Sequence, residues 1–309
     1  MDTEKCRALL CAITCGNLTA AAGQLGYTTS GLSRMMAALE GEIGIPLLIR
    51  SKQGVVPTKE CERMIPAFRE LVYWASHCDQ LSAELRGLEI GSISVGSAYG
   101  AFYPWLSRVI AEFRAKYPGI EVRFLEGNSS ELCQAVEEHR ADFCIISQRE
   151  GEHTWIPLLD DPLVAWVPEN HPLARLAAVP VQAFAKEPFI DTFPGENTDN
   201  VRLFAQLRIH PNIQFTSAES RATYAMVEAG LGITLYNSVT ARKWTGHVRI
   251  LPLDPPQSVS IGIAVPRSEL MSPAARKFVV FAQHRIPENL REAGPKAIDY
   301  SDEQTSGRV

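Results

Sequence analysis

The sequence lacks several features that would each place a protein in a particular class. No stretch of its 309 residues approaches the ~18 consecutive apolar residues that a membrane-spanning helix needs, which excludes an integral membrane protein. The opening residues Met1 to Arg7 are not followed by the long apolar core of a signal peptide, so we expect a cytoplasmic protein. With 46% hydrophobic and 21% charged residues, the composition is that of a globular chain.

An excess of positive charge is also missing. The chain has 30 Lys and Arg residues against 35 Asp and Glu, a formal net charge of −5, so its overall charge does not indicate a nucleic-acid partner. Residues 1–60 nevertheless carry six cations against five anions, which makes this segment +1 and the remainder −6. The asymmetry weakly favours the N-terminal segment as the contact for any polyanion.

Sequence patterns typical of metal centres and enzymes are absent too. All seven cysteines lie in the first half of the chain without CxxC spacing, and residues 1–60 contain no histidine. We therefore expect reduced cysteines with structural or surface roles, no metal and no cofactor. HExxH, GxGxxG and P-loop patterns do not occur, and Ser97 in Gly96-Ser97-Ala98-Tyr99-Gly100 is one residue out of register for G-x-S-x-G, so we expect no enzyme.

Residues 1–57 have the pattern of three short helices followed by a hairpin. Gly16-Asn17 can end the first helix, Thr19 can open the second, and Thr28 or Thr29 can cap the third. Two helices joined by a tight, glycine-containing turn form a helix-turn-helix, whose second helix enters the DNA major groove. Residues 47–50 and 55–57 then predict a wing with a basic tip. The stripe expected to be buried on the third helix is Leu32, Met35, Met36 and Leu39.

Residues 58–89 predict one long helix, because apolar residues recur every three or four positions. Pro66 should kink this helix near its start. A heptad pattern favours a dimer, since the helix needs a partner along its length; the alternative is packing on its own domain. The seam residues expected at the dimer interface are Met64, Phe68, Leu71, Ala75, Cys78 and Leu85.

Beyond residue 90, strands and helices alternate, which predicts a parallel sheet with covering helices. A second series of the same kind begins after Asp160-Asp161-Pro162. We expect lobe I at about 90–161 plus 266–290 and lobe II at about 162–265. A ligand would bind in the crevice between them, at the carboxyl ends of the strands. Residues 291–309 lack apolar periodicity and are predicted to be disordered.

The sequence resembles the LysR-type transcriptional regulators. The resemblance is carried by 16–22 (GNLTAAA), 30–33 (SGLS), 47–50 (LLIR), 113–120 (FRAKYPGI), 169–174 (ENHPLA) and 227–233 (VEAGLGI), and it extends over about residues 5–286. It implies a winged helix-turn-helix DNA-binding domain (1–57), a dimerising linker helix (58–89) and a two-lobed α/β effector domain of periplasmic-binding-protein-like type (90–290). The resemblance alone implies a homotetramer. Gly31 stands where the family more often has alanine.

The candidates for contact with double-stranded DNA lie on the third helix and the wing. Hydroxyls and free backbone N–H groups at a helix start can bind phosphates or base edges, and Arg34 could contact guanine through two hydrogen bonds. Alternatively, Arg34 contacts only phosphate, and Arg50 pairs with Glu40 or Glu42 inside the domain. The candidate set is Thr28, Thr29, Ser30, Ser33, Arg34, Arg50 and Lys52.

The candidates for effector contact follow predicted strands. The resemblance implies that these loops line the inducer cleft, where hydroxyls and helix N-terminal amides suit a small anion such as a carboxylate. The alternative for each is ordinary capping and turn chemistry. The candidate set is Ser97, Tyr99, Gly100, Asn128, Ser129, Ser147 and Thr192.

The sequence therefore predicts a sequence-specific DNA-binding transcriptional regulator whose α/β domain senses a small molecule. Effector binding would change the DNA-bound assembly. The alternative is a small-molecule binding protein whose N-terminal helices serve assembly rather than DNA recognition.

Overall fold

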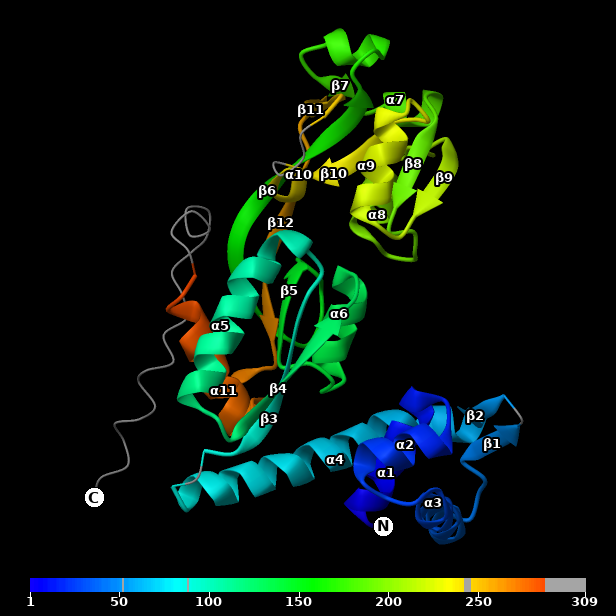
Figure 1. Cartoon of the computed structure of the whole chain (residues 1–309), viewed down its shortest axis with the longest axis vertical. Coiled ribbons are helices and arrows are strands. Elements are labelled where there is room, and N and C mark those ends of the chain that lie inside the picture. The colour runs from blue at the N-terminus through cyan, green and yellow to red at the C-terminus, as the bar shows by residue number, and fades with distance from the viewer. Residues whose placement is uncertain (52, 88, 242–245, 287–309) are drawn as a thin grey trace. The chain divides into compact units, whose positions relative to one another are not determined.

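The structure, a computed structural model, describes residues 1–51, 53–87, 89–241 and 246–286 (Figure 1). The chain divides into two compact units. The first contains Met1–Gly91 with two short stretches, Glu138–Arg140 and Ser272–Ala274, and the second contains the rest. Lys52 and the predicted disordered tail lie outside the described residues.

The first three helices begin and end at residues suited to those positions. Asp2, Asn17 and Thr28 accept hydrogen bonds from backbone N–H groups of the first turns, so the second helix is capped by Asn17 and not opened by Thr19 as predicted. Each helix is followed by a glycine in the left-handed conformation, which glycine adopts without steric cost. The three helices are α1 (Thr3–Cys15), α2 (Leu18–Leu25) and α3 (Thr29–Ile43).

A two-stranded wing follows α3 and is attached to the turn between α1 and α2. Strands β1 (Leu48–Ser51) and β2 (Gly54–Pro57) pair antiparallel. The Val55 N–H donates to the Gly16 carbonyl at 2.7 Å. Gly54 has φ +132, and a Cβ there would lie 2.1 Å from the Gly16 oxygen. Only glycine allows this close approach of two backbones.

Replacing Gly54 with alanine should lower the free energy of unfolding of the DNA-binding domain by at least ~1–3 kcal/mol, the usual cost of one strained backbone position. The clash is with a backbone oxygen, which cannot rotate away. Thermal unfolding of the full chain measures the change. Gly41→Ala is the control: a Cβ at Gly41 in α3 meets nothing within 4 Å, so this change should stabilise by about 1 kcal/mol. Equal effects of the two changes would contradict the prediction.

The long helix α4 (Lys59–Leu85) has two different apolar faces. Cys61 and Phe68 are fully buried in one core with residues of α1, and Met64 packs against the same core. The alternative of packing on its own domain thus describes the N-terminal part of this helix. Phe68, predicted at the dimer seam, belongs to the domain core instead, because α1 covers it.

Further along α4, a second face is exposed. Its large apolar side chains are spaced by three and four residues, and Leu85 is 89% exposed. Ala75, between Leu71 and Cys78, is only partly exposed and is not one of the large apolar side chains of this face. We call the exposed set the α4 stripe: Leu71, Trp74, Cys78, Leu81 and Leu85.

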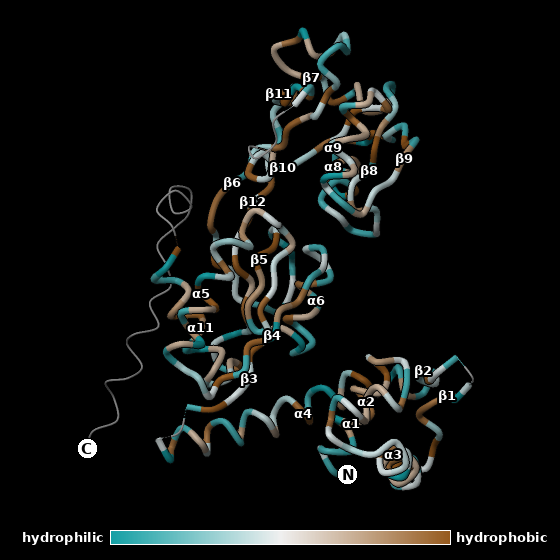
Figure 2. The backbone as a smooth tube through the Cα atoms, in the orientation of Figure 1, coloured by the Kyte–Doolittle hydropathy of each residue, from teal (hydrophilic) through white to brown (hydrophobic). Residues whose placement is uncertain are grey.

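The second unit contains two lobes joined by two long strands, β6 (Thr154–Pro168) and β12 (Ser258–Val265). In lobe I, β3 pairs parallel with β5, and β12 pairs antiparallel with β5 and β6. Figure 2 shows hydrophobic stretches along the central strands of this sheet, and all of β5 is buried. The other elements of lobe I are β3 (Gly91–Ser97), α5 (Tyr103–Lys116), β4 (Ile120–Glu126), α6 (Ser129–Glu137), β5 (Phe143–Ser147) and α11 (Pro273–Gln283).

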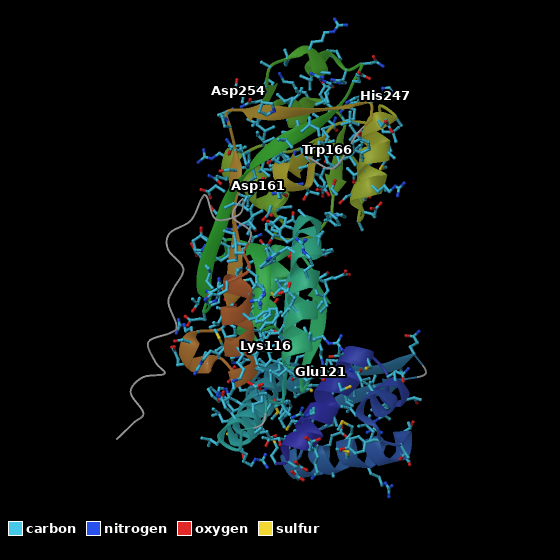
Figure 3. All side chains as sticks on the ribbon, turned by 60° about the vertical axis from the view of Figure 1, so that its left-hand side comes forward. Lys116, Glu121, Asp161, Trp166, His247 and Asp254 are labelled. Carbon is cyan, nitrogen blue, oxygen red and sulfur yellow. The ribbon has the colours of Figure 1, made fainter. Side chains whose placement is uncertain are left out.

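Lobe II is built on the second half of β6, whose Trp166 is fully buried and stacks on Tyr236 with ring centroids 4.2 Å apart (Figure 3). The strands β10 and β11 both pair antiparallel with β6, whereas β8 and β9 pair parallel. The elements are β7 (Val179–Pro180), α7 (Ala183–Lys186), β8 (Phe189–Thr192), α8 (Asp199–Leu207), β9 (Ile213–Ser217), α9 (Ser220–Glu228), β10 (Thr234–Asn237), α10 (Ser238–Ala241) and β11 (Val248–Asp254).

The predicted fold class is confirmed, with one correction to the sheet. The expectation of a parallel sheet holds for β3 with β5 and fails for every strand paired with β6. A buried strand has the same apolar sequence pattern whether it pairs parallel or antiparallel, because both faces of the sheet are covered. Direction depends on the path of the chain between strands, and here β6 and β12 cross both lobes.

Candidate DNA-binding and effector sites

The start of α3 presents an exposed row of hydroxyls. Thr28, Thr29 and Ser30 are all exposed, and the Thr28 Oγ1 accepts a hydrogen bond from the Gly31 N–H at 3.0 Å. A Cβ at Gly31 would lie 3.0 Å from that same Oγ1, closer than an ordinary van der Waals contact, so glycine suits this position. The remaining free N–H groups of the first turn can meet an anion.

Arg34 and Arg50 differ in how far they are engaged within the domain. Arg34 is exposed one turn into α3. The Arg50 guanidinium donates to Ser33 Oγ at 2.9 Å and lies 3.8 Å from a Glu40 carboxylate oxygen, so it has the intradomain partner considered from the sequence. Glu40 also accepts hydrogen bonds from the Leu47 and Leu48 N–H groups. Arg50 thus links the wing to α3, and Arg34 is the exposed cation of the recognition helix.

At the strand ends of the second unit, three side chains converge on one carboxylate. Tyr99 donates from its hydroxyl to Asp199 Oδ2 at 2.5 Å, and Ser147 donates to Asp199 Oδ1 at 2.5 Å. The Arg149 guanidinium is 2.7 Å from the same Oδ1. Asp199 begins α8 in lobe II, whereas its partners follow strands of lobe I. The three donors together form an anion-binding set in lobe I, and its contact with Asp199 joins the two lobes.

The anion-binding set is supported by a second group of hydrogen bonds. Arg149 Nε donates to Ser130 Oγ at 2.9 Å, and that hydroxyl donates to the Asn197 carbonyl of lobe II at 2.8 Å. The Ser147 N–H donates to Ser129 Oγ at 3.0 Å. Asn128 caps α6 by accepting from two backbone N–H groups. These contacts fix Arg149 and Ser147 before any ligand arrives.

Both members of the Arg149–Asp199 ion pair are largely buried. The Arg149 side chain is 6% exposed and that of Asp199 is 17% exposed. Burial and the Asp199 charge both raise the pKa of Tyr99, so its hydroxyl stays protonated and acts as a donor. The anion-binding set therefore offers a guanidinium and two hydroxyl donors to one carboxylate.

Other predicted effector residues are engaged elsewhere. The Ser97 hydroxyl bonds with the backbone of Tyr99, which is the turn chemistry considered as its alternative. Thr192 donates to Thr223 Oγ1 at 3.1 Å and lies 3.4 Å from Thr234 Oγ1, so its hydroxyl sits in a buried threonine cluster of lobe II. Gly100 begins a short 3-10 helix. Tyr99, Ser129 and Ser147 are thus the predicted residues that the structure brings together.

The sequence analysis missed Arg149 and Asp199, the two charged members of the site. A signal was present for Arg149, because a cation two residues beyond a buried strand can turn into a cleft. Asp199 follows the cap residue Thr198 at the start of α8, where an acidic residue is ordinary helix chemistry. Nothing in its local sequence distinguishes it from such a residue.

Among the described residues, no helix is long and apolar enough to cross a membrane. None of the seven cysteines forms a disulfide. Burial is the main cause that raises the pKa of Cys61 to about 11, so this cysteine is a neutral thiol in the domain core.

Two protein-family models match the chain. The model described as "Bacterial regulatory helix-turn-helix protein, lysR family" matches residues 3–62. The model described as "LysR substrate binding domain" matches residues 86–287. The first match contains the wing and α3, and the second contains both lobes.

Curated relatives are similar to the chain over most of its length. The chain is 27% identical over 273 residues to the uncharacterized HTH-type transcriptional regulator YvbU of Bacillus subtilis, covering 87% of this chain and 93% of that protein. It is 28% identical over 292 residues to the probable HTH-type transcriptional regulator LrrA of Synechococcus elongatus, covering 93% and 98%.

Solved structures share the fold. A full-length OxyR variant from Pseudomonas aeruginosa superposes with a TM-score of 0.69 at 19% identity, covering 97% of this chain and 99% of that one. The effector binding domain of QuiR, solved in complex with shikimate, has a TM-score of 0.52 at 24% identity, covering 63% and 96%.

Proposed function

The chain belongs to the LysR family of DNA-binding transcriptional regulators, and we propose that its exposed α3 surface reads an operator while a small carboxylate controls it from the cleft. It has the family's effector-binding domain and is a regulator, not an enzyme. The helix-turn-helix family match sets aside the alternative in which the N-terminal helices serve assembly only. A protein that works on the bacterial chromosome acts in the cytoplasm, where we place it.

The single observation that carries the DNA role is the exposed surface at the start of α3. Three hydroxyl side chains and Arg34 lie there, with the wing held beside them by Arg50. A recognition helix contacts base edges with its N-terminal residues, and an arginine there can bind guanine O6 and N7. We infer that Arg34 reads a base and that Thr28, Thr29, Ser30 and Ser33 position the helix.

Replacing Arg34 with alanine should weaken binding to the promoter region beside the protein's own gene by about 1–3 kcal/mol, the discrimination of one good arginine–guanine contact. Fluorescence anisotropy with the promoter fragment and with random DNA, each at several salt concentrations, distinguishes a contact of Arg34 with a base from a contact with phosphate. Loss of a base contact weakens binding to the promoter fragment only. A phosphate contact weakens both DNAs equally and lowers the salt slope by about 1.

Arg249→Ala is the matched control, since Arg249 is an exposed cation on β11, far from α3 in the sequence. Its loss should leave promoter binding unchanged. Promoter affinity that survives Arg34→Ala would overturn the assignment of Arg34 to DNA.

The effector class follows from the group that occupies the anion-binding set. In this structure the carboxylate of Asp199 fills it, held by Arg149, Ser147 and Tyr99. A small ligand with a carboxylate can make the same three contacts after Asp199 withdraws. Such a ligand would break the contact of Asp199 with the anion-binding set and bind the set itself. Ligand binding would therefore be coupled to the relative position of the two lobes. Shikimate, the ligand in the QuiR structure, is also a carboxylate.

We infer that two copies of the chain associate through the α4 stripe. Its spacing of three and four residues is that of a coiled-coil seam, and exposed leucines at these positions need a partner. The interface we propose keeps Leu71, Cys78 and Leu85 from the sequence prediction, adds Trp74 and Leu81, and leaves out Met64, Phe68 and Ala75. A homotetramer stays an implication of the family.

A further inference from the structure

Three potential metal ligands meet in lobe I at the C-terminal end of α6. The N-terminal end of the same helix supports the anion-binding set. Cys133 and Glu137 lie four residues apart on α6, on one face of the helix. His153 comes from the turn that precedes β6. The Cys133 Sγ is 3.7 Å from His153 Nδ1 and 3.9 Å from Glu137 Oε1, and the latter two atoms are 3.6 Å apart.

These three separations are close to those around a tetrahedral zinc ion. Zinc bonds of ~2.3 Å to sulfur and ~2.0–2.2 Å to nitrogen and oxygen place neighbouring ligand atoms roughly 3.3–3.6 Å apart. The observed triangle is wider by only a few tenths of an ångström. One ion can therefore contact all three atoms with small side-chain movements and no change of backbone.

The surroundings hold the three groups in place. The His153 side chain is 2% exposed and Cys133 is 5% exposed, whereas the Glu137 side chain is 32% exposed, so one side is open to solvent. Glu137 Oε1 also accepts a hydrogen bond from the Glu152 N–H at 2.9 Å. A Cβ at Gly151 would lie 1.7 Å from that oxygen, so glycine allows the carboxylate to lie against the turn.

We propose that Cys133, Glu137 and His153 bind a divalent transition-metal ion of the zinc class, with water at the fourth position. One sulfur, one imidazole nitrogen and one carboxylate oxygen form a borderline-soft set that favours zinc or cobalt over magnesium or calcium. Binding releases the thiol proton of Cys133 to solvent. The sequence analysis expected no metal because this spacing matches no short motif; the fold brings the ligands together.

The site adds a connection within lobe I. The ion would join the end of α6 to the residue before β6, and Ser147 and Arg149 lie on the segment that leads to His153. Both ends of this segment would then be held, one by the anion-binding set and the other by the metal. The metal proposal itself does not depend on the identity of the effector.

The test uses the full-length protein, reduced with a phosphine and stripped of metal, titrated with Co²⁺ and then with Zn²⁺. Absorption shows both the visible bands of tetrahedral Co²⁺ and the ultraviolet charge-transfer band of a thiolate bound to cobalt. We expect one such Co²⁺ per chain, displaced by Zn²⁺. Cys133→Ser should abolish the charge-transfer band, and His153→Gln should weaken affinity beyond the ~10–100-fold that loss of an outer-shell partner costs.

Glu137→Gln is a milder variant, because the amide oxygen can still accept from the Glu152 N–H while the anionic ligand is lost. It should bind Co²⁺ more weakly than wild type and unfold at the same temperature, which keeps the test informative if Cys133→Ser fails to fold.

Two controls separate this site from others. Cys11 and Cys15 have sulfur atoms 4.0 Å apart and could themselves hold a soft metal ion, so their double change to serine, which should leave the cobalt spectrum unchanged, tests that alternative. His247→Gln removes an exposed histidine paired with Glu169 and should also have no effect. No cobalt binding by wild type, a spectrum that survives Cys133→Ser, or a spectrum lost in the Cys11 and Cys15 variant would each overturn the proposal.

Discussion

Replacing Asp199 with asparagine is expected to tighten the binding of a small carboxylate to the cleft by roughly 10–100-fold. The apparent dissociation constant is the intrinsic one divided by the fraction of molecules able to bind, so an internal carboxylate seated in 90–99% of molecules costs about that factor. Asparagine lacks the charge that holds the side chain on Arg149, and the anion-binding set becomes free. Arg149→Gln should have the opposite effect and abolish binding, because it removes the cation.

Isothermal titration with acetate, succinate, benzoate and shikimate measures both effects. Thermal unfolding gives a second readout: Asp199→Asn leaves Arg149 without its ionic partner and should lower the melting temperature, and a bound carboxylate should restore it. Glu150→Gln is the matched control, since it removes an exposed carboxylate next to Arg149 in the sequence. The control should behave as wild type.

The carboxylate proposal fails if none of the four compounds binds to Asp199→Asn. It also fails if a compound binds and neither Asp199→Asn nor Arg149→Gln changes its affinity. A compound that binds more weakly to Asp199→Asn would show that Asp199 contacts the ligand directly, which contradicts the displacement proposed here.

Replacing Leu81 and Leu85 together with glutamate should convert the proposed dimer to a monomer and weaken promoter binding by ~100-fold or more. Leu81 and Leu85 are 42% and 89% exposed in the single chain, so the substitutions should not disturb its core. Charges facing each other across a coiled-coil seam repel, and they also remove the apolar contact. A dimer that binds two half-sites gains ~10²–10⁴ over one half-site, which is lost in the monomer.

Light scattering measures the mass, and anisotropy with the promoter fragment measures the affinity. The control is Asp79→Lys, compared with Leu81→Glu alone: both changes alter the charge at an exposed position, and Asp79 lies on another face of α4 than the α4 stripe. An unchanged mass in the double variant would refute the stripe as the interface. A monomer that binds the promoter as tightly as wild type would refute the avidity argument.

The sequence alone was enough for features that depend on neighbouring residues. The first helix of the DNA-binding domain ends before Gly16 and the third is capped by Thr28, because caps and left-handed turns are set by residue type within one turn of chain. Apolar periodicity located α4 and most strands of both lobes in the same way, but not β7 or β9. The family landmarks then gave the order of the domains and the function.

Tertiary structure decided what depends on distant partners. Residue spacing cannot tell that α1 covers Phe68 and leaves Leu81 exposed, since both lie on apolar faces of one helix. Asp199 meets Tyr99, 100 residues earlier in the chain, across two lobes. Cys133 meets His153 only because α6 packs beside the turn before β6. Each contact joins residues whose local surroundings are ordinary, so its chemistry arises from packing and not from any pattern along the chain.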